Sequence, residues 1–301
     1  MSSTERIAFM FAGQGAQHPG MGAALAKESP AAKRIFERAD QILGYSISDL
    51  CFNGTMEDLT PCRICQPAIF TVSIAMREAY RETHPEVTPH ACGGLSLGEF
   101  SAACEAGIFD FDSALRLVAE RGRLMDQCCQ DYPGGMAAIL GDTKPEEIQE
   151  ICTNSGIDVA NYNCPGQIVI SGEINGLEKA MAQLEATGSR VIRLTVAGAY
   201  HSRLMNSAAE AFGKVLEQYE IRKPSCIFLQ NVQGAPVDNP DAIRTNLQKQ
   251  IASSVRWEEC ASFITQNTQA ALEFGPGCVL SKFMKRISRR FTVSAPYADE
   301  A

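Results

Sequence analysis

The pentapeptide Gly94-Leu95-Ser96-Leu97-Gly98 has the pattern G-x-S-x-G and lies where the chain is predicted to pass from a strand into a helix. Residues 90–93 before it are small enough to end a buried strand, and residues 99–104 after it indicate a helix. A serine on such a turn is held in a strained backbone conformation, with its hydroxyl at a helix N-terminus where free N–H groups favour negative charge. The pattern predicts a nucleophile for a thioester or ester carbonyl. The alternative is an ordinary serine in a glycine-rich turn, since the pattern also occurs by chance.

Length and charge restrict the class of protein. With 301 residues, the chain can bury a large core, either as one large domain or as a domain with an insertion. The formal net charge of −8 argues against nucleic-acid binding, which needs a basic face. No apolar run is long enough to span a bilayer, and the first residues do not resemble a secretory signal. We therefore expect a cytoplasmic protein, a monomer, with no membrane or nucleic-acid partner.

The cysteines and histidines do not form a metal-site pattern. Twelve cysteines are scattered along the chain, and Cys62-x-x-Cys65 has no second pair at zinc spacing. None of the four histidines (His18, His84, His90 and His201) forms an H-x-x-x-H pair. We predict reduced, mostly buried thiols and no bound metal or cofactor.

Alternating strands and helices predict an α/β fold with a mostly parallel sheet. The first strand, residues 7–12, ends in a glycine-bracketed turn at residues 13–17, which is not a dinucleotide fingerprint because His18 replaces the third glycine. Such a turn still places backbone N–H groups at the edge of the sheet where α/β folds bind ligands. Further helices are expected over residues 29–43, 66–83 and 279–287, and over 112–130 with Asp112 as N-cap; a further strand is expected over 270–274.

A different rhythm between residues 134 and 196 predicts a separate small unit. Its strands are expected over residues 136–140, 158–161, 167–171 and 190–196, and its helices over 145–152 and 175–186. The order β-α-β-β-α-β is that of a ferredoxin-like unit. We predict that residues 131–197 form an inserted subdomain, and that residues 1–130 and 198–301 form the α/β body. A cleft between the two is a natural substrate site.

His201 is the best candidate for the base that a serine nucleophile needs. It follows Gly198-Ala199-Tyr200, where the inserted unit rejoins the body and small residues permit close backbone approach. The alternative for any single histidine is a surface or packing role.

Arg121 interrupts the apolar face of its predicted helix. That face carries Leu117, Val118, Leu124, Met125 and Cys128, whereas Arg116, Glu120, Arg123 and Gln127 lie opposite. A buried arginine keeps its charge and needs an anion or several carbonyl groups. Two interpretations stay open at this point, an internal ion pair and a fork for the free carboxylate of a substrate.

Basic side chains also gather on and after the helix predicted over residues 279–287. They are Lys282, Lys285, Arg286, Arg289 and Arg290. A solvated helix face is the simple interpretation, and a docking patch for CoA phosphates or an acidic partner is the alternative.

Five spaced motifs resemble the malonyl-CoA:acyl-carrier-protein transacylase family, the acyltransferases of fatty-acid and polyketide synthesis. They occur in the family's order and span residues 7 to about 290. The motifs are Phe11-Ala12-Gly13-Gln14-Gly15-Ala16-Gln17, Gly94-Leu95-Ser96-Leu97-Gly98-Glu99, Arg121-Gly122, Gly198-Ala199-Tyr200-His201-Ser202 and Phe274-Gly275-Pro276-Gly277. The resemblance implies a hydrolase-like α/β body with a ferredoxin-like insertion, which agrees with the element order.

The resemblance also implies a role for each site residue. Ser96 would be the acyl-accepting nucleophile and His201 its base, oriented by the backbone carbonyl of Gln250. The N–H groups of Gln14 and Leu97 would form the oxyanion hole. Arg121 would bind the malonyl carboxylate.

Two positions depart from the commoner family pattern. Leu95 replaces the histidine that many members have before the nucleophile, and Tyr200 replaces the commoner phenylalanine before the catalytic histidine. A bulky aromatic at position 200 narrows the room beside the acyl α-carbon, as in malonyl-selective members.

The implied activity is ping-pong transfer of malonyl from malonyl-CoA to the phosphopantetheine thiol of acyl carrier protein, for fatty-acid biosynthesis. The alternatives are a polyketide-pathway acyltransferase and an acyl-thioester hydrolase on the same scaffold. A non-catalytic partner of a fatty-acid or polyketide assembly would have lost the serine or the histidine, and this sequence keeps both.

Overall fold

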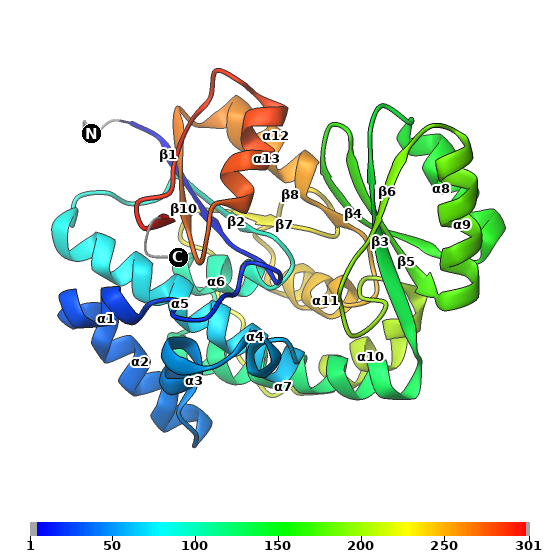
Figure 1. Ribbon diagram of the computed structural model, residues 1–301. Helices are drawn as coiled ribbons and strands as arrows, with labels where there is room; N and C mark the ends of the chain where they lie inside the picture. Colours follow the sequence, from blue (N-terminus) through cyan, green and yellow to red (C-terminus); the bar gives the residue numbers. More distant parts are fainter. Residues whose placement is uncertain (1–4, 299–301) are drawn as a thin grey trace.

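The computed structural model describes residues 5–298, which are organised around two sheets (Figure 1). The larger sheet has the strand order β11-β10-β1-β2-β7-β8, and its first five strands are parallel. Strand β8 pairs with β7 in the antiparallel direction. The strands are β1 (Ile7–Phe11), β2 (Ala91–Gly94), β7 (Ile227–Gln230), β8 (Ala235–Pro236), β10 (Ala270–Phe274) and β11 (Thr292–Ser294). The predicted α/β class with a mostly parallel sheet is confirmed.

Helices cover both faces of this sheet, because successive side chains of a strand point to opposite sides. On β1, Phe9 and Phe11 pack into the core that contains α5 and α7, whereas Ala8 and Met10 pack against α12 and α13. The helices of the body are α1 (Ala23–Glu28), α2 (Pro30–Leu43), α3 (Ile47–Asn53), α4 (Met56–Leu59), α5 (Cys62–Thr83), α6 (Gly98–Glu105), α7 (Phe111–Asp131), η1 (Arg203–Met205), α10 (Asn206–Leu216), α11 (Pro240–Gln250), α12 (Trp257–Asn267) and α13 (Val279–Ile287).

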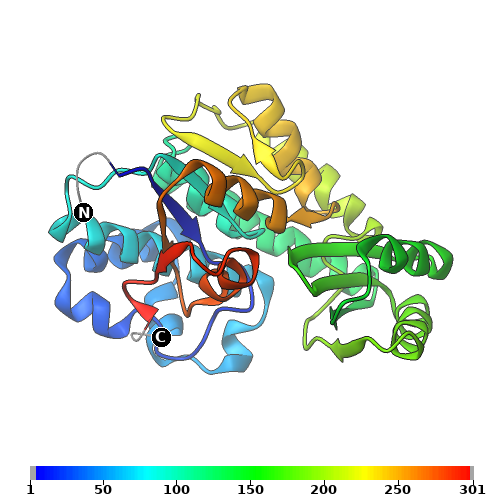
Figure 2. The ribbon, with the colours of Figure 1, turned by 90° about the horizontal axis from the view of Figure 1, so that it is seen from above.

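The smaller sheet stands beside the body, with α8 and α9 on its outer side (Figures 1 and 2). Its strand order is β6-β3-β5-β4-β9, and the first four strands pair with one another in the antiparallel direction. The elements are β3 (Gly134–Leu140), α8 (Pro145–Ser155), β4 (Asp158–Cys164), β5 (Gln167–Glu173), α9 (Ile174–Ala186), β6 (Arg190–Arg193) and β9 (Val255–Arg256). Strand β9 comes from the C-terminal part of the chain and pairs in parallel with β4, so the two sheets are tied together at this edge.

Most predicted elements lie where the sequence placed them, but two details were wrong. Asp112 is not the N-cap of its helix, because α7 begins at Phe111 and the side chain of Asp110 accepts the Ser113 N–H at 2.7 Å. Asp112 instead accepts a hydrogen bond from Arg38 Nε at 3.0 Å. The strand predicted over residues 190–196 ends at Arg193, and the residues that follow line a cavity.

Cysteine burial follows the prediction. All twelve cysteines are free, and nine of them are buried.

Within residues 5–298, no helix is long and apolar enough to cross a membrane.

The two aspartates at the start of α7 give a direct stability test. Replacing Asp110 by Ala removes the cap and should lower the free energy of unfolding by about 1 kcal/mol. Replacing Asp112 by Ala removes only an exposed ion pair with Arg38 and should cost less. Urea denaturation of both variants measures the difference, and an equal or larger loss for Asp112→Ala would contradict the assignment of the cap.

Candidate active site

Ser96 lies on a tight turn between β2 and α6. Its φ of 51° is in the left-handed region, which a residue with a side chain rarely adopts and which indicates local strain. A Cβ at Gly98 would lie 2.1 Å from the Phe11 carbonyl oxygen, so only glycine allows α6 to start this close to β1. The Asn231 side chain fixes the turn, because its Oδ1 accepts the Ser96 N–H at 2.6 Å and its Nδ2 donates to Gly94 O at 2.8 Å.

His201 is in position to accept the Ser96 proton. Its Nε2 lies 2.8 Å from Ser96 Oγ, and its Nδ1 lies 2.8 Å from the carbonyl oxygen of Gln250. Because a carbonyl can only accept, Nδ1 carries the hydrogen of the neutral ring and Nε2 is left as the acceptor. Burial, with the charge of Arg121 adding to it, lowers the pKa of His201 to about 4. The imidazole is therefore neutral at pH 7 and can act as a base.

The chain before His201 approaches α7 closely, as its small residues predict. A Cβ at Gly198 would lie 2.2 Å from Cys129 Sγ. His201 itself has a φ of 57°, so the nucleophile and the base both have positive φ values. Strain of this kind occurs where the surrounding structure fixes a functional group.

Arg121 reaches the same point from α7. It is 1% exposed, and its Nη2 donates to Ser96 Oγ at 3.0 Å and to Gln250 Oε1 at 2.9 Å. Its Nη1 donates to Gln66 Oε1 at 2.7 Å, whereas Nε has no partner. Burial lowers the pKa of Arg121 to about 10, so the guanidinium stays charged at pH 7. Among residues 5–298, no carboxylate lies within ion-pair distance of it, and the interpretation as an internal ion pair is wrong.

Two backbone N–H groups beside Ser96 make no hydrogen bond within residues 5–298. The Leu97 N–H stands at the start of α6, and the Gln14 N–H lies in the turn after β1. Both Gln14 and Ser96 line the same cavity.

That cavity, of about 630 Å³, lies between the two sheets. Ser96, His201 and Tyr200 contribute from the body, and Asn161, Asn163 and Gln167 contribute amides from the small sheet. Arg121 does not line the cavity and contacts it through Ser96 Oγ. The arrangement of a hydroxyl, a neutral imidazole and free N–H donors is suited to acyl transfer through a serine ester.

Comparison with known proteins agrees with this chemistry. Residues 8–292 match the family described as the acyl transferase domain. The malonyl CoA-acyl carrier protein transacylase of Bacillus subtilis (strain 168) is 40% identical over 296 residues, which cover 96% of this chain and 93% of that relative. The chain belongs to the malonyl CoA-acyl carrier protein transacylase family.

Solved structures of this family are similar along nearly the whole chain. The malonyl CoA-acyl carrier protein transacylase from Clostridium perfringens ATCC 13124 has a TM-score of 0.91 and 36% identity, covering 96% of this chain and 93% of its own. A malonyl-transacylase in complex with a holo type II PKS acyl-carrier protein also has a TM-score of 0.91 and 36% identity, with 96% and 95% covered. The family resemblance read from the sequence is confirmed, and the protein is an acyltransferase.

The structure brings together the side chains that the sequence singled out and adds three that it did not. Ser96, His201, Arg121 and the Gln250 carbonyl lie within one hydrogen-bonded group. Gln66, Glu99 and Asn231 complete that group. Glu99 ends the serine motif, but nothing in the sequence indicates its partners. Asn231 follows the end of β7, and the position of a polar residue at that edge of a parallel sheet was the one available signal.

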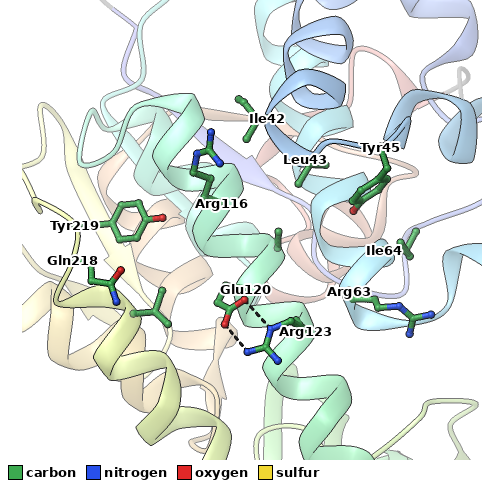
Figure 3. A pocket seen from close by; sticks show the side chains of 12 residues that line it. Ile42, Leu43, Tyr45, Arg63, Ile64, Arg116, Glu120, Arg123, Gln218 and Tyr219 are labelled. Carbon is green, nitrogen blue, oxygen red and sulfur yellow. Dashed lines mark hydrogen bonds and ion pairs between the residues drawn. The ribbon is translucent and has the colours of Figure 1, made fainter.

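A second hollow of about 670 Å³ lies away from these residues, between α7 and the ends of α2 and α10 (Figure 3). Two of its three arginines are paired, Arg123 with Glu120 at 2.6 Å and Arg63 with Asp126 at 3.5 Å. None of the predicted site residues lines it, so it is not the reaction site.

The basic cluster on α13 borders the cavity. Val279 and Phe283 of this helix line the cavity, whereas Lys282, Lys285 and Arg286 are exposed. Arg286 also donates to Gly166 O of the small sheet at 3.4 Å. The cluster is therefore a solvated helix face.

The lowered pKa of His201 predicts how the reactivity of Ser96 depends on pH. Because the neutral form of the base persists at acid pH, reaction of Ser96 with phenylmethylsulfonyl fluoride should fall only as the pH drops toward about 4. The rate is measured by intact mass spectrometry, with circular dichroism to confirm folding at each pH. A midpoint at or above the ordinary 6.5 would contradict the description of His201 as a buried base next to a cation.

Proposed function

We propose that the enzyme transfers a malonyl group from malonyl-CoA to the phosphopantetheine thiol of an acyl carrier protein, through an ester on Ser96. The observation that carries this proposal is that His201 Nε2 and Arg121 Nη2 both contact Ser96 Oγ, at 2.8 and 3.0 Å. The 40% identical relative from Bacillus subtilis, a malonyl CoA-acyl carrier protein transacylase, supports it.

In the first half-reaction His201 Nε2 takes the proton as Ser96 Oγ attacks the thioester carbonyl. The Gln14 and Leu97 N–H groups stabilise the tetrahedral oxyanion, and the carbon–sulfur bond then breaks. The departing thiolate of CoA takes the proton from His201. Each oxyanion donor of this kind typically contributes on the order of 10²–10³ in rate.

In the second half-reaction the same residues work in reverse order. His201 removes the proton of the carrier's thiol, the thiolate attacks the malonyl-serine carbonyl, and Ser96 leaves as an alcohol that takes the proton back. The side chains of Asn161, Asn163 and Gln167 face the cavity and match the amides of a pantetheine arm. Asn163 Oδ1 is buried without a partner, which leaves an acceptor for such an amide.

Arg121 and Tyr200 would select the acyl group. The guanidinium is charged, buried and bonded to neutral amides, so a malonyl carboxylate can exchange with Ser96 Oγ and Gln250 Oε1 as its acceptor. The ring of Tyr200 lines the cavity, and its hydroxyl accepts a hydrogen bond from Cys62 Sγ at 3.0 Å. That bond holds the ring in place beside the acyl group.

The domain division, the location and the pathway are part of the same proposal. The unbroken order of β3, α8, β4, β5, α9 and β6 supports residues 131–197 as the inserted ferredoxin-like subdomain, with residues 1–130 and 198–301 as the body.

We place the enzyme in the cytoplasm as a monomer that needs no cofactor and supplies fatty-acid synthesis. The exposed basic face of α13 would meet the acidic carrier or the CoA phosphates.

Brief incubation with malonyl-CoA should add the mass of one malonyl unit to the protein. The Ser96→Ala variant should gain none, because the ester cannot form without the hydroxyl. Intact mass spectrometry measures both. Adding holo acyl carrier protein should then move the malonyl unit from the enzyme to the carrier, whereas loss of the ester to water at the same rate with and without carrier would favour a hydrolase.

Replacing Arg121 by Ala should remove the preference for malonyl over acetyl groups. Loss of a buried, charge-assisted pair with the substrate should lower kcat/KM for malonyl-CoA relative to acetyl-CoA on the order of 100-fold. Arg116→Ala, on the exposed face of the same helix, is the matched control and should keep the wild-type ratio. A full malonyl preference in Arg121→Ala would refute the carboxylate-binding role.

A further inference from the structure

A fully buried carboxylate, Glu99, lies behind the site, one residue into α6. Three N–H groups donate to it. Gln230 Nε2 donates to Oε1 at 3.0 Å, and the Asn231 backbone N–H and Gln250 Nε2 donate to Oε2 at 2.8 and 2.9 Å. We propose that Glu99 is a positioning residue for acyl transfer: its ionised carboxylate fixes Gln250 and Asn231, and through them His201 and Ser96. This inference rests on the proposed function.

The hydrogen-bond pattern requires the ionised form of Glu99. Both carboxylate oxygens accept from N–H donors, Oε1 from one and Oε2 from two. Burial raises the pKa of Glu99, and the three donors and the charge of Arg121 oppose that effect. A neutral carboxyl would leave one donor unsatisfied in a buried place, which is costly.

Gln250 connects Glu99 to the base. Its Nε2 donates to Glu99 Oε2 and to the Ser96 carbonyl oxygen at 2.9 Å, so its side chain is clamped between α6 and the nucleophile turn. Its backbone carbonyl accepts from His201 Nδ1, and its Oε1 accepts from Arg121. Gln250 is the last residue of α11, so a shift of it would move the carbonyl that orients the imidazole. Arg121 would still be held by Gln66 Oε1, to which its Nη1 donates at 2.7 Å.

Asn231 connects Glu99 to the nucleophile. Its backbone N–H is held by Glu99, and its side chain binds the backbone of Ser96 and of Gly94. The strained φ of Ser96 needs such support, because nothing in an isolated turn would favour it. One carboxylate thus supports both partners of the 2.8 Å Ser96–His201 contact.

Glu99 also supplies the nearest negative charge to a site that holds a permanent cation. Arg121 interacts electrostatically with Glu99, His201, Cys62 and Tyr200, and Glu99 also interacts with Cys260 of α12. When His201 gains a proton during the reaction, two positive groups stand side by side. The carboxylate offsets that charge, as the aspartate of a serine-hydrolase triad does. Unlike that aspartate, it does not bond the histidine directly, because Gln250 lies between them.

Glu99→Gln is the direct test. The amide cannot accept from all three donors, so Gln250 must shift, and the single-turnover rate constant for acylation of Ser96 should fall on the order of 100-fold. Affinity for malonyl-CoA should stay unchanged, and the loss should be equal for malonyl-CoA and acetyl-CoA. The single-turnover rate constant describes only the folded molecules that react, so it does not depend on the fraction of protein that is folded. A variant that is only less stable would therefore keep the wild-type rate constant.

Glu105→Gln is the matched control. Glu105 ends the same helix, its side chain is 2% exposed, and it pairs with Arg77 and Arg81 away from the cavity. This variant should lose stability but keep the wild-type acylation rate constant. Glu99→Asp keeps the charge with a shorter reach, and its rate should lie between those of Glu99→Gln and wild type; it serves as the second variant if Glu99→Gln does not fold.

Three outcomes would overturn the inference. They are an unchanged acylation rate in Glu99→Gln, an equal loss in Glu105→Gln, and a loss confined to malonyl-CoA, which would place Glu99 on substrate binding. Modification of Ser96 by phenylmethylsulfonyl fluoride separates this inference from the proposed function. If wild type formed no malonyl ester, the function would be wrong, while slower modification of Glu99→Gln would still support the positioning role.

Discussion

The contact between the buried guanidinium of Arg121 and Ser96 Oγ is the constraint on which the rest of the site depends. A charge that is 1% exposed must be held by oriented polar groups, or it would destabilise the fold. Here the holders are Gln66, Gln250 and the nucleophile itself, none of which carries a negative charge. The fold therefore keeps a cation beside the nucleophile without a direct ion pair, which leaves its N–H groups able to exchange their neutral acceptors for an acidic acyl group.

The topology explains how distant parts of the chain meet here. Ser96 follows β2 and Asn231 follows β7, and these neighbouring parallel strands end at the same edge of the sheet. Helix α7 brings Arg121 to that edge, and the chain that returns from the small sheet brings His201. Since β9 also extends the small sheet, the cavity has walls from both units and its shape depends on how they are joined.

Local patterns in the sequence predicted the parts of the site that depend on short-range structure. G-x-S-x-G identified Ser96, and the helical spacing showed that Arg121 lies on a buried face. The sequence did not predict the bonds of Glu99 to Asn231 and Gln250, because these residues are 132 and 151 positions from Glu99 and only the closed fold brings them together. The error over Asp112 has a similar origin, since either of two nearby aspartates satisfies the same capping pattern and backbone geometry selects Asp110.

A crystal structure of the malonyl-loaded enzyme tests the central claim most directly. If Arg121 binds the substrate's free carboxylate, both oxygens of that group should accept hydrogen bonds from its guanidinium, and its bond to Ser96 Oγ should be gone. A malonyl ester on Ser96 whose carboxylate points into the open cavity, with Arg121 still bonded to Gln66 and Gln250 alone, would contradict the account.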